Sequence, residues 1–295
     1  MEVTETDVQE LVELAAQSTG DLSTSQAKWI VSPAVCRRYL AAAASASKPG
    51  AAAALPFLLR SARWRDEWAV DAMLEDYALA AFERSLRAVL LYEVCIDASG
   101  RSVMVERVGA WDLARLTNLV DESAEQVVRA HVLVNEQIRV RLDSGGGADR
   151  RGGAADRRAV LVFDLQGLGV GHLACRSLLR LFATLSRLDS EHFPDTVGTI
   201  VCVDAPRAFA ALWAVVSRLV ATGTRQKLLV YASTARAEAL GALRELCGAA
   251  CLPRELGGAR DDAPPYSSVG IEAEGHVDHD DQPEEGVDVG ETTAA

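Results

Sequence analysis

The stretch from Ala159 to Gly258 alternates between short apolar runs and amphipathic segments, and this alternation constrains the fold more than any other feature. The apolar runs that resemble strands lie at 159–164, 197–203 and 226–232. The segments with helical periodicity lie at 172–188, 207–220 and 234–247. Strands that alternate with helices predict an α/β domain with a parallel or mixed sheet.

The chain before this stretch predicts a helical subdomain followed by a strand and one long helix. Helices are expected up to Ala16, from Pro33 to Ala46, up to Trp68, from Val70 to Leu91 and from Thr117 to Leu142. Thr6 and Gln9 are expected to form the capping box of the first helix. A strand is expected over 103–107, and the glycine-rich segment 143–156 is expected to be a flexible loop.

These patterns divide the chain into three parts. A helical subdomain covers 1–90, an α/β domain covers 91–258, and an acidic tail covers 259–295. The tail holds few apolar residues, so we expect it to be disordered.

The formal net charge of −12 arises almost entirely from that tail, which holds 11 acidic residues and one basic residue. The rest of the chain carries 29 basic against 31 acidic residues, and a nearly neutral body argues against nucleic acid as a partner. The acidic, amphipathic start predicts no signal peptide. No apolar run approaches the roughly 20 residues that span a bilayer, so the expected compartment is the cytoplasm.

A glycine-rich turn follows the strand at 159–164 and suggests two interpretations. Gly167, Gly169 and Gly171 precede a helix, as the glycines of a dinucleotide-binding turn do. That motif also requires a second strand that ends in an acidic residue about 20 residues later, and none follows here. The favoured interpretation is that the glycines only turn the chain tightly.

The sequence offers no convincing catalytic group. His131, His172 and His192 have no serine or cysteine partner motif, and His172 is expected to make a helix-start contact. Cys247 and Cys251 lie one helical turn apart, but no second pair completes a metal site, so inert packing is favoured over metal binding. We therefore expect no catalytic residues, no metal and no cofactor.

Several segments together carry a family resemblance. They are AVLVFDLQGLG, HFPDTVGTIVCVDAP, the apolar helix with Trp213, GTRQKLLVYAS and LPRELGG. From about Val31 to Gly258 the chain resembles the CRAL-TRIO lipid-binding domain of phosphatidylinositol transfer proteins. The resemblance implies a mixed, mostly parallel sheet as the floor of a lipid cavity and a helical lid over it. It also implies one bound lipid and no enzymatic activity.

The resemblance implies a headgroup site. In family members that bind phosphatidylinositol, an acid after Phe-Pro and a lysine 32 residues later, preceded by a threonine, contact the inositol phosphate. Asp195, Lys227 and Thr224 match this pattern, with the shorter Asp where Glu is usual. Lys48 matches a further family lysine that precedes a Trp-Arg pair, although the surrounding basic segment is mostly alanine here. The alternative is that these residues are ordinary solvated surface groups.

The resemblance also implies a lid and a cavity lining. The lid residues would form one stripe of helix 207–220, which an ordinary sheet-covering helix would also show: Phe209, Leu212, Trp213, Val216, Leu219 and Val220. The candidate lining residues occupy alternate strand positions: Leu161, Phe163, Ile200, Cys202 and Leu229. The sequence does not decide which sheet face they occupy.

The favoured hypothesis is a non-enzymatic protein that sequesters one phospholipid and exchanges or presents it at membranes. Phosphatidylinositol is the favoured ligand, because family members that load phosphatidylcholine carry hydroxyls at the positions of Ala159 and Leu161. The expected partners are the lipid, a transient membrane surface and, in a presentation role, a lipid kinase, with a monomer favoured. Two alternatives stay open: a carrier of a sterol or tocopherol-like isoprenoid, and an interaction module with a collapsed cavity.

Overall fold

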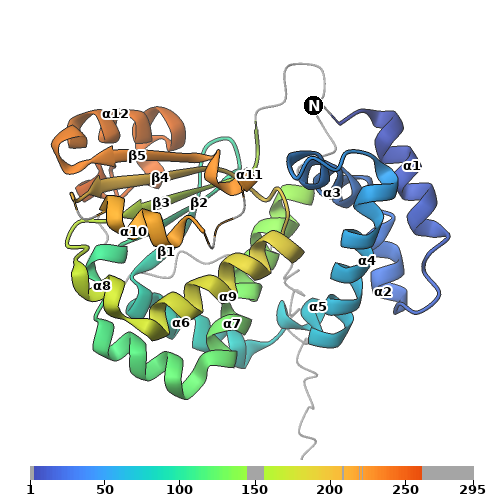
Figure 1. Ribbon diagram of the computed structural model, residues 1–295, viewed down its shortest axis with the longest axis horizontal. Helices are drawn as coiled ribbons and strands as arrows, with labels where there is room; N and C mark the ends of the chain where they lie inside the picture. The colour runs from blue at the N-terminus through green and yellow to red at the C-terminus, as the bar shows by residue number, and fades with distance from the viewer. Residues whose placement is uncertain (1–2, 145–155, 208, 219, 221, 261–295) are drawn as a thin grey trace, which may run out of the picture.

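The computed structural model describes residues 3–144, 156–207, 209–218, 220 and 222–260. A sheet lies between helices on both of its faces, and a group of N-terminal helices stands beside this layered unit (Figure 1). The predicted fold class, an α/β domain preceded by helices, is confirmed. No helix among the described residues is long and apolar enough to cross a membrane. The expected flexible loop and acidic tail fall largely outside the described residues.

The first four of the six N-terminal helices pack around a core of their own, whereas the last two share a core with the sheet domain. Their bounds are α1 (Glu5–Ala16), α2 (Thr24–Ile30), α3 (Pro33–Ser45), α4 (Ala51–Trp68), α5 (Val70–Met73) and α6 (Tyr77–Leu90). The predicted capping box was wrong by two residues: the Thr4 hydroxyl accepts from the Asp7 amide at 3.2 Å, and the Asp7 carboxylate accepts from the Thr4 amide at 2.9 Å. Helix α2 was not predicted, because its seven residues are too few to establish a period.

The sheet has five strands in the order β1-β2-β3-β4-β5. Their bounds are β1 (Tyr92–Ile96), β2 (Ser102–Glu106), β3 (Ala159–Asp164), β4 (Val197–Ala205) and β5 (Leu228–Ala232). Strands β1 and β2 form an antiparallel hairpin, and the remaining neighbours are parallel. Strand β1 was not predicted, because its apolar residues continue directly from the end of α6.

The helices that follow β2 cover the sheet on its two faces. Helices α7 (Leu113–Ser144), α8 (Val170–Ala174), α9 (Arg176–His192), α10 (Phe209–Val216) and α11 (Thr222–Arg225) precede α12 (Arg236–Cys247). Figure 1 shows α12 on one side of the sheet and α7, α9 and α10 on the other. We call these sides the α12 face and the α7 face.

The two faces are packed to different degrees. On the α12 face, Val103, Val105, Val160 and Val162 are buried against a cluster that includes Leu243. On the α7 face of the same two strands, the alternate side chains Met104, Glu106, Leu161 and Phe163 all keep accessible surface. Central strands beneath helices are normally closed by packing. The helices therefore leave the α7 face incompletely filled.

The glycine-rich turn after β3 has a packing role. Gly167 has a φ of 94°, a left-handed conformation that few other residues adopt. A Cβ on Gly109 would lie 2.2 Å from the carbonyl oxygen of Gln166, so the two loop backbones pack directly on one another. His172 makes the predicted helix-start contact, because its Nδ1 accepts from the Gly169 amide at 3.2 Å. These contacts support the structural interpretation of the turn.

A buried ion pair joins the N-terminal helices to the sheet domain. Arg65 at the end of α4 is 1% exposed, and Glu136 of α7 is fully buried. The guanidinium donates to both carboxylate oxygens of Glu136, at 2.7 and 2.8 Å. It also donates to Gln26 at 3.0 Å and to Asp71 at 2.5 Å. The arginines around Glu136 lower its pKa to about 2 against the effect of burial, so the pair is ionised at neutral pH.

We expect Glu136→Gln to lower the free energy of unfolding by about 3–5 kcal/mol, because it leaves the Arg65 guanidinium buried without its counter-charge. Urea unfolding followed by tryptophan fluorescence measures this loss. The matched control is Arg37→Gln, which removes an exposed pair with Glu5 and should cost under about 1 kcal/mol. Equal losses in the two variants would contradict the assigned role of the buried pair.

A disulfide links β1 to the end of the described chain. Cys95 and Cys251 are bonded across a separation of 156 residues, with their Cα atoms 5.7 Å apart. Cys251 is therefore not half of a pair with Cys247, which remains a buried free thiol. No group of three or more potential metal-binding side chains occurs within the described ranges.

Because the disulfide closes so long a loop, its reduction is expected to lower the free energy of unfolding by about 2–5 kcal/mol. The measurement is urea unfolding with and without dithiothreitol. In Cys95→Ser the reductant should have no further effect, whereas in Cys36→Ser it should act as in the parent protein. An equal free energy of unfolding of the parent protein with and without dithiothreitol would contradict the prediction.

Candidate functional site

Three charged residues gather at the amino ends of neighbouring parallel strands. Arg158 directly precedes β3, Lys227 directly precedes β5, and Asp195 lies two residues before β4. Parallel strands begin at the same sheet edge, so residues far apart in sequence meet there. The Lys227 ammonium lies 3.1 Å from the Asp195 carboxylate, and the Arg158 guanidinium lies 2.7 Å from the same oxygen.

Lys227 uses only part of its hydrogen-bonding capacity. Its Nζ donates to Asp195 and, at 2.6 Å, to the carbonyl oxygen of Val197. An ammonium group has three N–H donors, so one remains for another acceptor. The side chain is 23% exposed, which leaves that donor within reach of a ligand.

Asp195 is held by the turn between α9 and β4. It follows Pro194 and adopts a φ of 54°, a left-handed conformation that aspartate tolerates better than most residues. The Thr196 hydroxyl closes the turn by donating to the carbonyl oxygen of Phe193 at 2.9 Å. Arg158, which sequence reasoning missed, fixes the carboxylate from the other side and links it to Asp156. Its place immediately before a strand was the available signal.

The other two predicted headgroup residues are Thr224, which lies in α11, and Lys48, which follows α3. Thr224 is in α11, and its carbonyl oxygen accepts from the Lys227 amide at 3.1 Å. Within the described chain, no hydrogen bond occupies the Thr224 hydroxyl. The end of α3 contacts α11, because a Cβ on Gly223 would lie 3.5 Å from Ser45. Lys48 follows Ser45 by three residues and is exposed.

Four of the five predicted lining residues share the α7 face. Leu161 pairs with Ile200, and Phe163 pairs with Cys202. Leu229 does not share this face, because it pairs with Val201 and so points to the α12 face. Leu228 and Val230 occupy the corresponding α7-face positions of β5. An apolar strand without polar alternation gave no signal for its register.

The predicted lid helix is shorter than the sequence indicated. Helix α10 ends at Val216, so Val220 lies beyond it, and Leu219 falls outside the described residues. Phe209 packs against Cys202 and its neighbours on the sheet, and its ring stacks on Trp213 with centroids 6.1 Å apart. Leu212 and Val216 belong to the same helix.

A second polar group lies on the α7 face, and sequence reasoning missed it. We call it the interior cluster: Glu106 of β2, His131 and Asn135 of α7, and Asp189 of α9. The His131 Nε2 lies 2.7 Å from the Asp189 carboxylate, and this contact helps raise the pKa of His131 against the effect of burial. Burial raises the pKa of Glu106 to about 8, with His131 acting in the opposite direction. The available signal was the alternation along β2, which places Glu106 on the same face as Met104 and opposite the valines.

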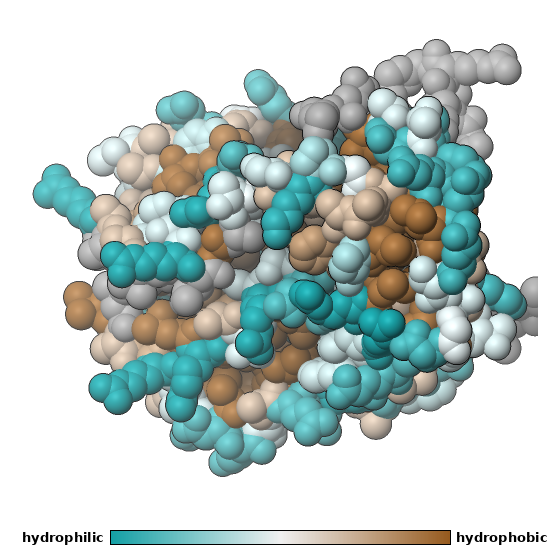
Figure 2. Space-filling model, turned by 45° about the vertical axis from the view of Figure 1, so that its right-hand side comes forward, coloured by the Kyte–Doolittle hydropathy of each residue, from teal (hydrophilic) through white to brown (hydrophobic). Residues whose placement is uncertain are grey.

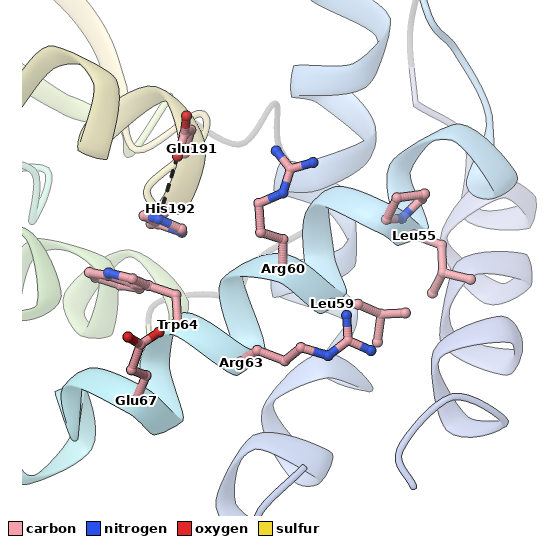
Figure 3. Close-up of a pocket in the computed structure, with 9 residues that line it drawn as sticks. Leu55, Leu59, Arg60, Arg63, Trp64, Glu67, Glu191 and His192 are labelled. Carbon is pink, nitrogen blue, oxygen red and sulfur yellow. Dashed lines mark ion pairs between the residues drawn. The ribbon is translucent and has the colours of Figure 1, made fainter. Parts of the chain in front are cut away.

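An open groove of about 650 Å³ lies between α4 and the end of α9 (Figure 3). In Figure 3 the rings of Trp64 and His192 lie parallel, and their centroids are 4.0 Å apart. Burial, with help from Arg60 and Arg65, lowers the pKa of His192 to about 4, so the stacked ring is neutral. No predicted site residue lines the groove. Figure 2, which brings the right-hand side of Figure 1 forward, shows hydrophobic and hydrophilic residues interspersed on that face of the molecule.

Glu106→Gln should change the pH dependence of stability. The folded Glu106 keeps its proton up to a pKa of about 8, whereas the unfolded chain loses it near about 4.3. The parent free energy of unfolding should therefore fall as pH rises between these values. Relative to the parent, the variant should gain about 1–3 kcal/mol between pH 5 and pH 8.5.

Urea unfolding at both pH values measures this difference. The groups around Glu106 are His131 on α7, Asp189 on α9, and Tyr92 on β1 with its partner Glu83 on α6. They are present in both proteins, so the difference isolates Glu106. A constant offset between parent and variant at both pH values would contradict the raised pKa.

Comparisons with known proteins match this architecture. "Protein real-time" of Anopheles gambiae is 27% identical over 206 residues, covering 68% of this chain and 28% of that protein. Phosphatidylinositol/phosphatidylcholine transfer protein SFH7 of Arabidopsis thaliana is 24% identical over 212 residues, covering 70% of this chain and 38% of that protein. The matched part thus spans less than two fifths of either relative.

The crystal structure of Sfh5 has the same fold. It matches with a TM-score of 0.56 and 13% sequence identity, covering 84% of this chain and 85% of the Sfh5 chain. The family model of the CRAL/TRIO domain matches residues 88–258, which include all five strands. Because this match extends over more than half of the chain, the protein belongs to the CRAL/TRIO domain family.

Proposed function

We propose that this protein binds a single phospholipid, phosphatidylinositol by preference, and exchanges or presents it at membrane surfaces. The observation that carries the proposal is the contact between Lys227 and Asp195 at the amino ends of β5 and β4, with one ammonium donor left over. The relative SFH7, which is named as a phosphatidylinositol/phosphatidylcholine transfer protein, supports the ligand class.

The polar groups at the amino ends of the parallel strands suit an inositol phosphate. The third N–H of Lys227 and the hydroxyl of Thr224 are donors suited to a phosphate diester, which is a charged acceptor. The Asp195 carboxylate accepts from inositol hydroxyls. Arg158 contacts that carboxylate and holds it in place, and it adds positive charge near the phosphate. Lys48, beyond the end of α3, supplies a further cation from the helical subdomain.

The acyl chains would lie on the α7 face. Leu161 and Phe163 keep accessible surface there, although they belong to a central strand. Each methylene removed from water contributes about 0.8 kcal/mol. Helix α10, with Phe209 and Trp213, would cover the chains and move outward when the protein meets a membrane.

Ala159 and Leu161 favour inositol lipid over choline lipid. Neither side chain can donate to a phosphate, so a choline headgroup would find no hydroxyl partner at these positions. In the proposed cycle the protein extracts the lipid, carries it through the cytoplasm, and releases it at a second membrane or to a lipid kinase. The cycle requires no bond to be made or broken.

Lys227→Ala is expected to reduce the transfer of phosphatidylinositol between vesicles at least tenfold, since it removes a charge-assisted contact worth about 1.5–3 kcal/mol. Radiolabelled phosphatidylinositol in donor vesicles gives the rate. The matched control is Lys28→Ala, which removes an exposed lysine of α2 and should transfer at the parent rate. Parent-like transfer by Lys227→Ala would show that the headgroup assignment is wrong.

Native mass spectrometry of protein purified from cells tests the carrier role itself. The expected spectrum contains the chain plus the mass of one phosphatidylinositol. A spectrum of the bare chain alone would contradict every carrier role and favour an interaction module.

A further inference from the structure

Strand β5 ends the sheet, so within the described chain only one of its sides faces another strand (Figure 1). Directly before β5, the carbonyl oxygen of Lys227 accepts from the Ile200 amide of β4 at 2.9 Å. Backbone groups along a strand point alternately to its two sides, so those of Leu228 and Val230 point away from β4. Across the described residues, no hydrogen bond from outside the ladder reaches the backbone of Leu228 or Val230. The outer side of β5 therefore has N–H and C=O groups available to a further strand.

The side chains of this edge strand are apolar on both faces of the sheet. The sequence of β5 is LLVYA, which holds no charged residue and no proline. Leu229 on the α12 face is 47% exposed, and Val230 on the α7 face is 44% exposed. Charged residues and prolines normally protect an edge strand, because an open apolar edge pairs readily with other strands. Strand β5 has neither protection.

The opposite edge of the sheet is different. Strand β1 contains Glu93, which is 5% exposed and pairs with Arg260 at 2.7 Å. The disulfide between Cys95 and Cys251 attaches the end of the described chain to the same strand. An inward-pointing charged residue is a device that keeps edge strands from pairing with other chains. The contrast identifies β5 as the edge to which a further strand can be added.

Strand β5 is complementary to a second copy of itself. An antiparallel pair around a two-fold axis at Val230 sets Val230 against the partner's Val230, Leu228 against the partner's Ala232, and Leu229 against the partner's Tyr231. Because Val230 directs its backbone groups outward, it can exchange both N–H···O bonds with the partner's Val230, as opposed residues of an antiparallel ladder do. The opposed side chains are all apolar or aromatic, and such cross-strand pairs stabilise a sheet.

The residues beside β5 also allow this pairing. The same register sets Lys227 against the partner's Ser233 and Gln226 against the partner's Thr234, so it brings no like charges together. A charged segment from another source would find no counter-charge within β5, whereas a second copy supplies an equally uncharged strand. The charge pattern therefore favours a second copy as the occupant of this edge.

We propose that two copies of this protein associate through β5, which pairs antiparallel with the partner's β5 and joins the two sheets into one. A five-residue strand covers less than the roughly 800 Å² per partner of a stable interface, so we expect a reversible dimer with a dissociation constant on the order of 10 µM. A monomer was expected from the sequence, since the edge position of β5 follows only from the strand order of the folded sheet. The dimer does not depend on the proposed lipid ligand.

Sedimentation velocity of the full chain at increasing concentration tests the association. The weight-average mass should rise from that of one chain towards that of two. A parent protein that still sediments as one chain at about ten times the expected dissociation constant would overturn the proposal.

Charge substitutions at the two-fold axis test the register. Val230→Glu and Val230→Lys each set like charges directly opposite one another, so each should weaken self-association at least tenfold. An equimolar mixture of the two variants sets opposite charges together and should restore a dimer that contains both. The matched control makes the same two substitutions at Val170, which is 73% exposed on α8, and should associate as the parent does. Parent-like association of the Val230 variants, or a mixture that associates no better than either alone, rules out this pairing.

Amide hydrogen exchange of the parent protein gives a test that needs no substitution. The Val230 amide should gain protection as the protein concentration rises, because only the dimer places an acceptor opposite it. Concentration-dependent protection at other amides alone would show that the dimer uses another surface. Protection of the Val230 amide that is independent of concentration would show that a segment of the same chain occupies the edge, and this too would overturn the proposal.

Discussion

The buried pair between Arg65 and Glu136 fixes the helical subdomain against the sheet domain. Such a pair is costly to bury and more costly to leave half-formed, so it favours one arrangement of the two parts. One residue before Arg65, Trp64 stacks on His192 at the end of α9, and the Ser61 hydroxyl donates to the carbonyl oxygen of Glu191 at 2.9 Å. Helix α4 therefore holds the end of α9 in place.

The turn that carries Asp195 begins immediately after this point. Only Phe193 and Pro194 separate His192 from Asp195, and Asp195 is where Arg158 and Lys227 meet. The position of the charged edge thus depends on contacts made by a helix more than 120 residues earlier in the chain. The helical subdomain has a structural role in the site even though its only candidate ligand contact is Lys48.

Particular elements show how far sequence reasoning reached. Strands β3, β4 and β5 were anticipated because their apolar runs are short and bounded by polar turns. Strand β1 was missed because its apolar residues continue directly from the end of α6. Helix α10 was predicted too long because apolar periodicity continues beyond Val216. The approach of Asp195 and Lys227 followed from a family spacing. Arg158 and Glu106 match no such spacing, and only their strand positions would have indicated them.

The amino-acid sequence alone indicates most of the strands and helices in their order, the apolar character of the sheet and the charges available at the ends of its strands. These properties are local, because periodicity and turn residues act over a few positions. Tertiary structure decided which sheet face stays open, that Leu229 points away from that face, and that Cys95 rather than Cys247 meets Cys251. It also decided that Glu106 of β2 lies near His131 of α7. Strand register and helix packing are long-range, and a shift of one residue exchanges the two faces of a strand.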